Sequence, residues 1–366
     1  MVGMFAFRRV RRSRVVAAVV SVTTAVLLVA LTGCGNSSSN PDGDKQVQTL
    51  PPATAPAAPP GSPERVAGIT APVPAGSSGV AVSGETVGVL GPGGTQILRF
   101  ATATPTAPPA TTETPRLVAL HPVGDGSFLG AGPGVVVRVD PTGAVQRGRL
   151  SADDPLTIAD APGGRVLVGT AGGHVLVLDA DLRQVRDIPG FVRVDDITVA
   201  PSTAGDVRGQ VVVLDRAQSS VTPVDLDSGE LGPALRAGNG ATNATVDKFG
   251  RILVANTRDG EIVGFFGSPL VMRFRYPMAG GPYAVDYDDT RGLLWVSGTA
   301  DNEVVAYDLA SGEPSEKHRV ASVAQPDTIA VDDRTGTLYV LSGRDGVLQI
   351  IGPPYPLSGV SPVRPG

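Results

Sequence analysis

Short apolar runs rich in Val, Ile and Leu follow one another from about residue 76 to residue 352, and Gly, Asp or Asn breaks each of them. In residues 284–313, successive runs are separated by the turns 288–292, 298–302 and 308–312. Asp, Asn and Gly tolerate the backbone angles of tight hairpins, whereas β-branched residues favour strands. This stretch therefore predicts a unit of four antiparallel β-strands, and the runs are too short for long helices.

The same unit recurs along the chain at intervals of roughly 40 residues. Copies begin near Val80, Leu117, Ile158, Ile197, Thr245, Ala284 and Ile329. An insertion over residues 202–209 lengthens the fourth copy. A period of about 40 residues with four strands in each unit is typical of β-propeller blades. The sequence therefore predicts an all-β, seven-bladed β-propeller with four-stranded antiparallel blades over residues 76–352.

The second predicted strand of two units contains a motif that is typical of a family of β-propeller repeats. Leu338-Tyr339-Val340-Leu341 and Leu294-Trp295-Val296-Ser297 stand where the repeat of the YVTN and NHL classes has its name-giving motif. The units resemble these classes of β-propeller repeat over the whole predicted propeller. The resemblance implies the fold, but it implies no single function because the family is functionally mixed.

Closure of the ring requires one more strand than the last unit provides. That unit has three predicted strands and stops at Ile351, before Pro353-Pro354. An open ring would expose sheet edges that invite aggregation. We expect residues 65–70 to supply the missing outer strand. Both ends of the propeller would then meet at one blade, the anchor would leave from the rim there, and residues 353–366 would form a C-terminal tail.

The first residues have the three parts of a signal peptide. A basic head is followed by an apolar run, residues 15–31, and then by small residues. The arginines of the head are Arg8, Arg9, Arg11, Arg12 and Arg14. Guanidinium groups stay on the cytoplasmic side, so the chain after the run is exported. The Arg8-Arg9 pair lacks the surrounding consensus of the twin-arginine route, which favours export by Sec.

The end of this segment, Leu31-Thr32-Gly33-Cys34, resembles the lipobox of bacterial lipoproteins. The resemblance implies that the Cys34 thiol receives diacylglycerol, that residues 1–33 are cleaved away, and that the mature protein carries fatty acyl chains such as palmitate. Cys34 is the only cysteine in 366 residues, so it has no intrachain disulfide partner. The alternative is an uncleaved membrane span, for which the run is near the short end of about 17 to 25 residues.

The residues between the lipobox and the propeller are mostly Ser, Ala, Thr, Pro and Gly. Such a segment buries too little apolar surface to offset the entropy of ordering. Residues 34–75 are therefore predicted to be a disordered, semi-extended tether that begins at the lipidated Cys34, with the closing strand near its end. The Thr- and Pro-rich residues 101–115 have a similar composition.

The charge of the chain excludes one class of partner. Without residues 1–33, which hold five of the 30 basic residues and none of the 35 acidic ones, 25 basic and 35 acidic residues remain, a net charge of −10. Nucleic-acid binding requires a basic surface, usually with aromatic stacking platforms, and aromatic residues are 4% here. The acidic balance also argues against electrostatic membrane binding beyond the lipid.

Polar residues gather at two sets of loops on one face of the predicted propeller. The resemblance implies that ligands of such propellers bind on this face, around the central channel. The loops that lead into inner strands hold Asp195, Asp196, Asn243, Tyr283 and Asp327, and the loops between second and third strands hold Arg258, Asp301, Asn302 and Arg344, with His174 close by. These side chains form a candidate site for a cation, a sugar or a peptide terminus. The alternative, which we favour, is that Asp and Asn only cap hairpin turns.

Other motifs have structural explanations. Residues 225–230 are spaced like a calcium loop, but the twelfth position is Arg236 where a bidentate Glu belongs. The glycine-rich residues 130–134 join two strands and not a strand and a helix, so they form a turn and not a phosphate loop. The pairs Asp288-Asp289 and Asp332-Asp333 occupy the same turn in successive blades, and Trp295 falls on a core position.

Catalytic motifs are missing from the sequence. The three histidines, His121, His174 and His318, lack the spacing of zinc ligands. The sequence contains no Gly-x-Ser-x-Gly elbow and no cysteine free for nucleophilic attack.

Three functions stay open. The first is a lipid-anchored, outward-facing, non-enzymatic module that binds or scaffolds a protein, peptide or glycan of the cell envelope, and the lack of a catalytic set favours it. The second follows from a resemblance to gluconolactonase and lyase propellers, which implies a divalent cation such as Ca²⁺ in the channel, held here by Asp196, Asn243, Asp301 and Asp327. The third is an extracytoplasmic sensor subunit that works with a separate signalling protein.

Overall fold

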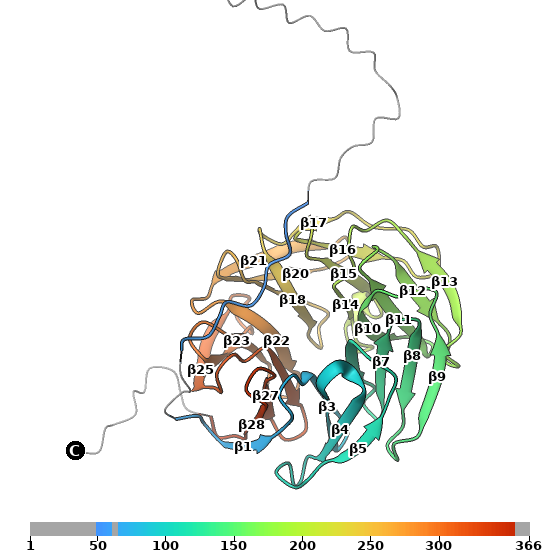
Figure 1. Ribbon diagram of the computed structural model, residues 1–366. Helices are drawn as coiled ribbons and strands as arrows, with labels where there is room; N and C mark the ends of the chain where they lie inside the picture. The colour runs from blue at the N-terminus through green and yellow to red at the C-terminus, as the bar shows by residue number, and fades with distance from the viewer. Residues whose placement is uncertain (1–48, 61–64, 356–366) are drawn as a thin grey trace, which may run out of the picture. The chain divides into compact units, whose positions relative to one another are not determined.

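The computed structural model describes residues 49–60 and 65–355. They form seven four-stranded antiparallel sheets arranged as blades around a central channel (Figure 1). The seven-bladed propeller predicted from the repeat is thus confirmed. The predicted signal peptide, Cys34 and residues 356–366 of the tail lie outside the described residues. Within the described part, no helix is long and apolar enough to cross a membrane.

Each blade runs from an inner strand at the channel to an outer strand at the rim. Blade 1 comprises β2 (Ser78–Ser83), β3 (Thr86–Leu90), β4 (Gln96–Ala101) and β5 (Ala110–Glu113); blade 2 comprises β6 (Ala119–Pro122), β7 (Phe128–Gly132), β8 (Val135–Val139) and β9 (Val145–Arg149). Blade 3 comprises β10 (Pro155–Ala161), β11 (Arg165–Thr170), β12 (Val175–Leu178) and β13 (Gln184–Ile188); blade 4 comprises β14 (Asp196–Val199), β15 (Val211–Asp215), β16 (Ser220–Val224) and β17 (Leu235–Arg236).

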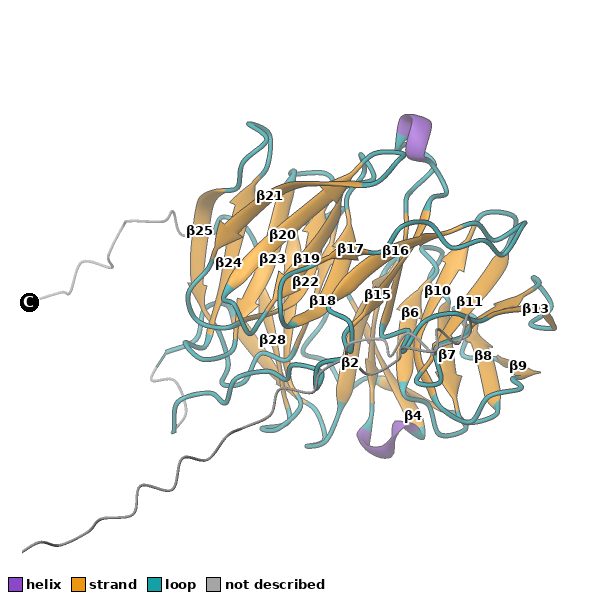
Figure 2. Cartoon of the chain, turned by 90° about the horizontal axis from the view of Figure 1, so that it is seen from above, coloured by secondary structure: helices purple, strands orange, loops and turns teal. Residues whose placement is uncertain are grey.

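The last three blades follow the same order. Blade 5 comprises β18 (Ala241–Val246), β19 (Ile252–Asn256), β20 (Glu261–Phe266) and β21 (Val271–Pro277); blade 6 comprises β22 (Pro282–Asp288), β23 (Leu293–Gly298), β24 (Glu303–Asp308) and β25 (Ser315–Ala321). Blade 7 comprises β26 (Thr328–Asp332), β27 (Thr337–Ser342), β28 (Val347–Ile351) and β1 (Ile69–Pro72). Two short 3-10 helices, η1 (Pro92–Gly94) and η2 (Gly205–Val207), lie on opposite faces of the disc (Figure 2).

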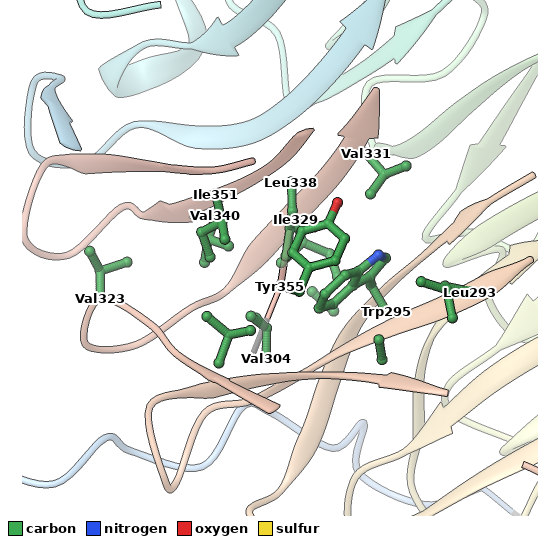
Figure 3. Close-up of a cluster of buried hydrophobic side chains, with 13 residues drawn as sticks. Leu293, Trp295, Val304, Val323, Ile329, Val331, Leu338, Val340, Ile351 and Tyr355 are labelled. Atoms are coloured by element: carbon green, nitrogen blue, oxygen red, sulfur yellow. The ribbon is translucent and has the colours of Figure 1, made fainter. Parts of the chain in front are cut away.

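The core lies between neighbouring blades, because the second and third strands are buried on both sides. Trp295 on β23 is fully buried and contacts the ring of Tyr355 edge to face, with 4.8 Å between the ring centroids (Figure 3). Aromatic pairs prefer this arrangement. The core position predicted for Trp295 is confirmed, and Tyr355 closes the seam between blades 6 and 7 after the last strand.

Buried aspartates cap the hairpins between first and second strands. Asp288 accepts a hydrogen bond from the backbone N–H of Arg291 at 2.8 Å and lies 3.2 Å from its guanidinium, and Asp332 has the same relation to Arg334. Buried carboxylates need such partners because desolvation is costly. These two acids therefore serve the turns, as the sequence indicated. Residues 225–230 form a hairpin turn as predicted, whereas only residues 133–134 of the glycine-rich segment 130–134 form the turn, since Gly130, Ala131 and Gly132 belong to β7.

The ring is closed by a strand from the front of the chain. β1 pairs antiparallel with β28, from Ile69 opposite Ile350 to Pro72 opposite Val347. The predicted clasp is confirmed, but it spans residues 69–72 and not 65–70. The chain turns at Gly68, which has a φ of +69°, and a Cβ there would lie 2.1 Å from the carbonyl oxygen of Ile350. Only glycine fits at this position, and the pairing with β28 begins at the next residue.

Residues 49–60, which fall inside the predicted tether, lie against the propeller. We call residues 50–59 the strap. Its first amide, Leu50 N–H, donates to the carbonyl of Ala217 in blade 4 at 2.7 Å, and Ala58 N–H donates to Oε1 of Gln325, just before blade 7, at 2.8 Å. The strap crosses blades 4 to 7, in blue in Figure 1. The chain therefore reaches the disc beside blade 4, and not at the closing blade as expected.

The clasp yields a stability prediction. Ala71 of β1 is 1% exposed, whereas the neighbouring Thr70 is exposed. Ala71→Asp would bury a carboxylate without a partner, so we expect the free energy of unfolding to fall by about 3 kcal/mol in urea denaturation. Thr70→Asp adds the same charge to the same strand on its outer side and should change it by less than about 0.5 kcal/mol. Equal effects of the two substitutions would contradict the observed packing of β1.

Candidate functional site

The inner strands of the seven blades enclose a channel with a cavity of about 920 Å³. Its acidic and basic lining residues are Asp160, Asp195, Asp196, Asp286, Asp333, His121 and Arg216, beside Tyr287. Carboxylates therefore outnumber basic groups along the wall. The channel is an acidic pore, and its chemistry depends on whether these carboxylates are free to contact a ligand.

Two of the carboxylates tie neighbouring blades together. Asp196 of blade 4 accepts a hydrogen bond from Ala244 N–H of blade 5 at 3.0 Å, and its other oxygen accepts one from Ile197 N–H at 2.9 Å. Asp286 of blade 6 accepts one from Val331 N–H of blade 7 at 2.8 Å. Charged acceptors form strong hydrogen bonds with amides. These side chains are thus bonded across the seams between inner strands.

Other seams are bridged by side chains as well. Asn243 of blade 5 donates from Nδ2 to the carbonyl of Tyr283 in blade 6 at 2.9 Å. His121 of blade 2 lies 2.8 Å from Asp160 of blade 3, between Nε2 and Oδ1. Together with Asp196 and Asp286, these contacts form a belt of polar bonds along the channel wall that bridges four of the seven seams. The belt adds to other polar contacts between blades, such as Asp289 N–H to Asp333 between blades 6 and 7, and to the apolar packing of the seams.

The protein environment shifts the pKa values of the belt in different directions. Burial raises the pKa of Asp286 to about 7, since it outweighs the hydrogen bonds from Val331 and Tyr287, and the negative charges of Asp333 and Asp289 add to the rise. Burial also raises the pKa of Asp196. In contrast, the hydrogen bond from His121 lowers the pKa of Asp160. The carboxyl of Asp286 therefore titrates near neutral pH.

Four of the predicted site residues lie together around Arg216. Asp196, Asn243 and Tyr283 surround Arg216, which donates from Nη2 to Asn243 Oδ1 at 2.9 Å and lies 6.0 Å from the centre of the Tyr283 ring. Asp195 accepts a hydrogen bond from Arg216 N–H at 2.9 Å. The sequence analysis did not predict Arg216 as a site residue. Its position could have indicated it, because Arg216 lies in a loop between second and third strands, as the candidates Arg258 and Arg344 do.

The other predicted residues lie apart from this group. Asp327 accepts a hydrogen bond from Gln325 at 2.9 Å, and Arg344 pairs with Asp345 at 2.7 Å. Asp301 lies against Gly280, where a Cβ would meet its carboxylate at 2.5 Å. None of Asp301, Asp327 and Arg344 lines the channel cavity. Their loops hold them on the face of the disc and away from the pore.

The remaining polar residues of this face also have partners. His174 lies 2.7 Å from Asp187, and Asn302 accepts a hydrogen bond from Gln325 N–H at 3.0 Å. Arg258 donates to the strap, at the carbonyl of Pro51. Each of these side chains therefore positions a loop or the strap.

The geometry limits the chemistry of the channel. The four residues proposed to hold a divalent cation do not surround one point, because Asp196 and Asn243 lie at the channel wall and Asp301 and Asp327 do not line it. Across residues 49–60 and 65–355, no group of three His, Cys, Asp or Glu side chains is placed to hold a metal ion.

Comparisons with known proteins identify the fold. No family model matches the sequence, and no curated protein matches it. Solved structures with a similar fold include hydrazine synthase of Kuenenia stuttgartiensis, at a TM-score of 0.65 and 14% identity over 78% of this chain and 97% of that one. Virginiamycin B lyase from Staphylococcus aureus has a TM-score of 0.61 and 14% identity over 77% and 98% of the two chains.

A streptogramin B lyase is similar to the same degree, with a TM-score of 0.64 and 13% identity over 79% of this chain and 97% of that one. Identities this low show the fold alone. The chain is thus a seven-bladed β-propeller that resembles the propellers of these proteins.

The raised pKa of Asp286 predicts a dependence of stability on pH. The folded protein holds this proton more tightly than the unfolded chain, whose carboxyl has a pKa near 3.8. The resulting stability is present below pH 3.8 and is lost as the pH rises through about 7. We therefore expect the Tm of the wild type to fall relative to that of Asp286→Asn between pH 5 and pH 8.

Asp345→Asn is the matched control, since Arg344 lowers the pKa of Asp345 and the group stays ionised over that range. Its Tm difference from the wild type should be constant from pH 5 to pH 8. A constant difference for Asp286→Asn as well would contradict the assignment of the raised pKa to Asp286.

Proposed function

We propose that the chain is an exported lipoprotein whose propeller serves as a non-enzymatic binding or scaffold module on the outward side of the cell membrane. The basic head, the apolar run and the lipobox-like residues 31–34 support export by Sec and lipidation of Cys34. The partner would be a protein, peptide or glycan of the cell envelope.

One observation carries the non-enzymatic part of the proposal. The polar side chains that face the channel, above all Asp196, Asn243 and Asp286, are bonded to the neighbouring blade. A catalytic group must be free to contact the substrate or the proton that it transfers. Breaking these bonds would cost stability because it would leave buried amides without partners. These bonds therefore favour a structural role for the polar residues of the channel wall. We infer that a partner binds to the loops on the face of the disc.

A cation-dependent enzyme is the second candidate, and the acidic cavity of about 920 Å³ is the observation in its favour. A thermal-shift series with Ca²⁺, Mg²⁺, Mn²⁺ and Zn²⁺ separates the two candidates. A ligand that binds only the folded state stabilises it by about 2.7 kcal/mol at 100 times its Kd. We expect no rise in Tm with any ion. A rise that Asp196→Asn abolishes would favour the enzyme.

Lipidation is tested at Cys34. We expect Cys34→Ala to abolish the incorporation of labelled palmitate, because Cys34 is the residue that would carry the lipid, whereas Ser37→Ala should retain it. Mass spectrometry of the membrane-bound wild type should find a diacylglyceryl-modified Cys34 as the first residue. An unmodified Cys34 in a chain that keeps residues 1–33 would overturn this part of the proposal.

The binding role is tested in intact cells with the lipidated protein. Chemical crosslinking followed by purification should recover the same envelope partner in independent cultures. Cys34→Ala should reduce its recovery, since the lipid concentrates the propeller near the membrane. Failure to recover any reproducible partner would contradict a scaffold function.

A further inference from the structure

The strap lies on the face of the disc where loops lead into the inner strands and join second to third strands. We call this the strap face, and over blades 5 to 7 it consists of residues 237–240, 257–260, 279–281 and 322–327. Contacts hold the strap at both ends and in the middle. This face therefore already binds a peptide segment, and its contacts show which kind of peptide it accepts.

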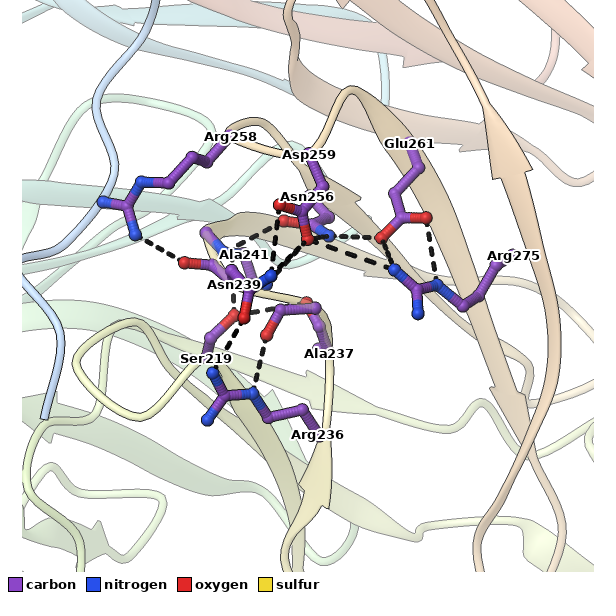
Figure 4. A network of polar contacts seen from close by, with 12 residues as sticks. Ser219, Arg236, Ala237, Asn239, Ala241, Asn256, Arg258, Asp259, Glu261 and Arg275 are labelled. Atoms are coloured by element: carbon purple, nitrogen blue, oxygen red, sulfur yellow. Dashed lines mark hydrogen bonds and ion pairs between the residues drawn. The ribbon is translucent and has the colours of Figure 1, made fainter. Parts of the chain in front are cut away.

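Arg258 holds the first part of the strap. Its Nη2 donates to the carbonyl of Pro51 at 2.8 Å, and its Nη1 donates to the carbonyl of Asn239 (Figure 4). Asn239 is fixed in turn, because its N–H donates to Asp259 Oδ2 at 2.9 Å. Asp259 also accepts a hydrogen bond from the buried side chain of Asn256 at 2.8 Å. The Arg258 guanidinium is thus held by contacts within blades 4 and 5 in addition to its bond with the strap.

Asp259, which holds Asn239 beside Arg258, stays negatively charged near neutral pH. Burial tends to raise the pKa of Asp259, but the hydrogen bonds from Asn256 and Asn239 and the charge of Arg275 lower it below the usual value. Asp259 therefore stays ionised and keeps Asn239 and Arg258 in place over the whole neutral range.

Gln325 holds the second part of the strap through both atoms of its amide. Nε2 donates to the carbonyl of Pro56 at 3.1 Å, and Oε1 accepts from Ala58 N–H at 2.8 Å. A neighbouring strand would satisfy a carbonyl and an N–H two residues apart in the same way. Gln325 has a φ of +56°, which is unfavourable for a residue with a side chain. Asn302 and Asp327 hold it in this conformation, and such strain is typical of ligand clamps.

Between these clamps, glycines leave room for the strap. Pro56 lies over Gly281, where a Cβ would come within 2.5 Å of the proline ring. Ala53 is 6% exposed and lies beside Gly240, where a Cβ would be 3.2 Å from its own. Small side chains and prolines fit these hollows, and larger ones would collide with backbone.

The strap itself defines the ligand class. Residues 51–60 read PPATAPAAPP, with five prolines. Proline lacks an N–H, so such a segment presents mainly carbonyl acceptors and is extended before it binds. A face that recognises it must supply donors, and Arg258 and Gln325 do so. The side chains and the peptide are thus complementary in hydrogen bonding and in shape.

We propose that the strap face of blades 5 to 7 is a binding site for extended Pro/Ala-rich peptides. The strap occupies this site within its own chain, and a Pro/Ala-rich segment of an envelope protein takes its place. The proposal rests on the proposed binding function and gives that function a site and a ligand. Because the strap is tethered at an effective concentration in the millimolar range, it competes with any peptide added from outside.

The test uses the full-length chain in which a Gly-Ser sequence of equal length replaces residues 50–59, so that β1 is kept. A fluorescein-labelled peptide with the sequence of residues 48–60 is titrated with this variant and followed by fluorescence anisotropy. We expect saturable binding to the variant and at least tenfold weaker binding to the wild type. A Gly-Ser peptide of the same length should not bind.

Substitutions in the same background locate the site. Arg258→Ala and Gln325→Glu should each weaken binding at least tenfold, since each removes a donor to a strap carbonyl. Arg344→Ala is the matched control, because Arg344 lies in the equivalent loop of blade 7 and pairs with Asp345 instead of the strap. Tm values report whether each variant folds, and using two independent sites keeps the test valid if one does not.

Absence of binding to the strap-replaced variant, or binding that neither Arg258→Ala nor Gln325→Glu weakens, would overturn the proposal. Recovery of an envelope partner in cells together with absence of peptide binding would leave the proposed function standing and refute only this site and ligand class.

Discussion

Pairing of β1 with β28 is the constraint on which the rest of the structure depends. Seven blades of one chain leave a sheet edge wherever the circle begins and ends, and an exposed edge both costs stability and invites association. Here the edge is covered by residues 69–72, which come from the opposite end of the chain. The amino-terminal segment is therefore fixed to blade 7, and the strap that precedes it is brought back over the strap face.

Polar residues at the channel also help to hold the ring together, because they bond neighbouring blades at their inner strands. Asp196, Asn243 and Asp286 bond to the next blade along the ring, so side chains that a ligand site would use are part of the framework. This explains how an acidic wall persists in a folded protein, since each of these groups has partners. It also moves the expected binding function from the pore to the loops, where Arg258 and Gln325 contact a peptide segment.

Much of the fold could be predicted from the sequence, because each blade repeats the same order of short apolar strands and turns rich in Gly, Asp and Asn. The closing strand was predicted because the last unit lacked one strand. It begins after Gly68, which adopts a positive φ, and not at residue 65 as predicted. The site was harder to predict, because loops at equivalent positions of different blades do not all approach the same point. Asp196, Asn243 and Tyr283 lie around Arg216, whereas Asp301 and Arg344 lie away from it. The docking of the strap was not predicted, because a Pro- and Ala-rich composition predicts no core and because the hydrogen bonds of the strap come from backbone carbonyl and N–H groups.

The strap also changes the geometry of the proposed anchor. If Cys34 carries the lipid, the chain between it and Leu50 spans at most about 55 Å, and Leu50 contacts the disc at blade 4. Hydrogen exchange of the full chain, read at residues 49–72 by mass spectrometry, tests this account most directly. It predicts slow exchange of the β1 amides, together with those of β28, and measurable protection of Leu50 and Ala58. Exchange of Leu50 and Ala58 at the rate of an unfolded chain would contradict it.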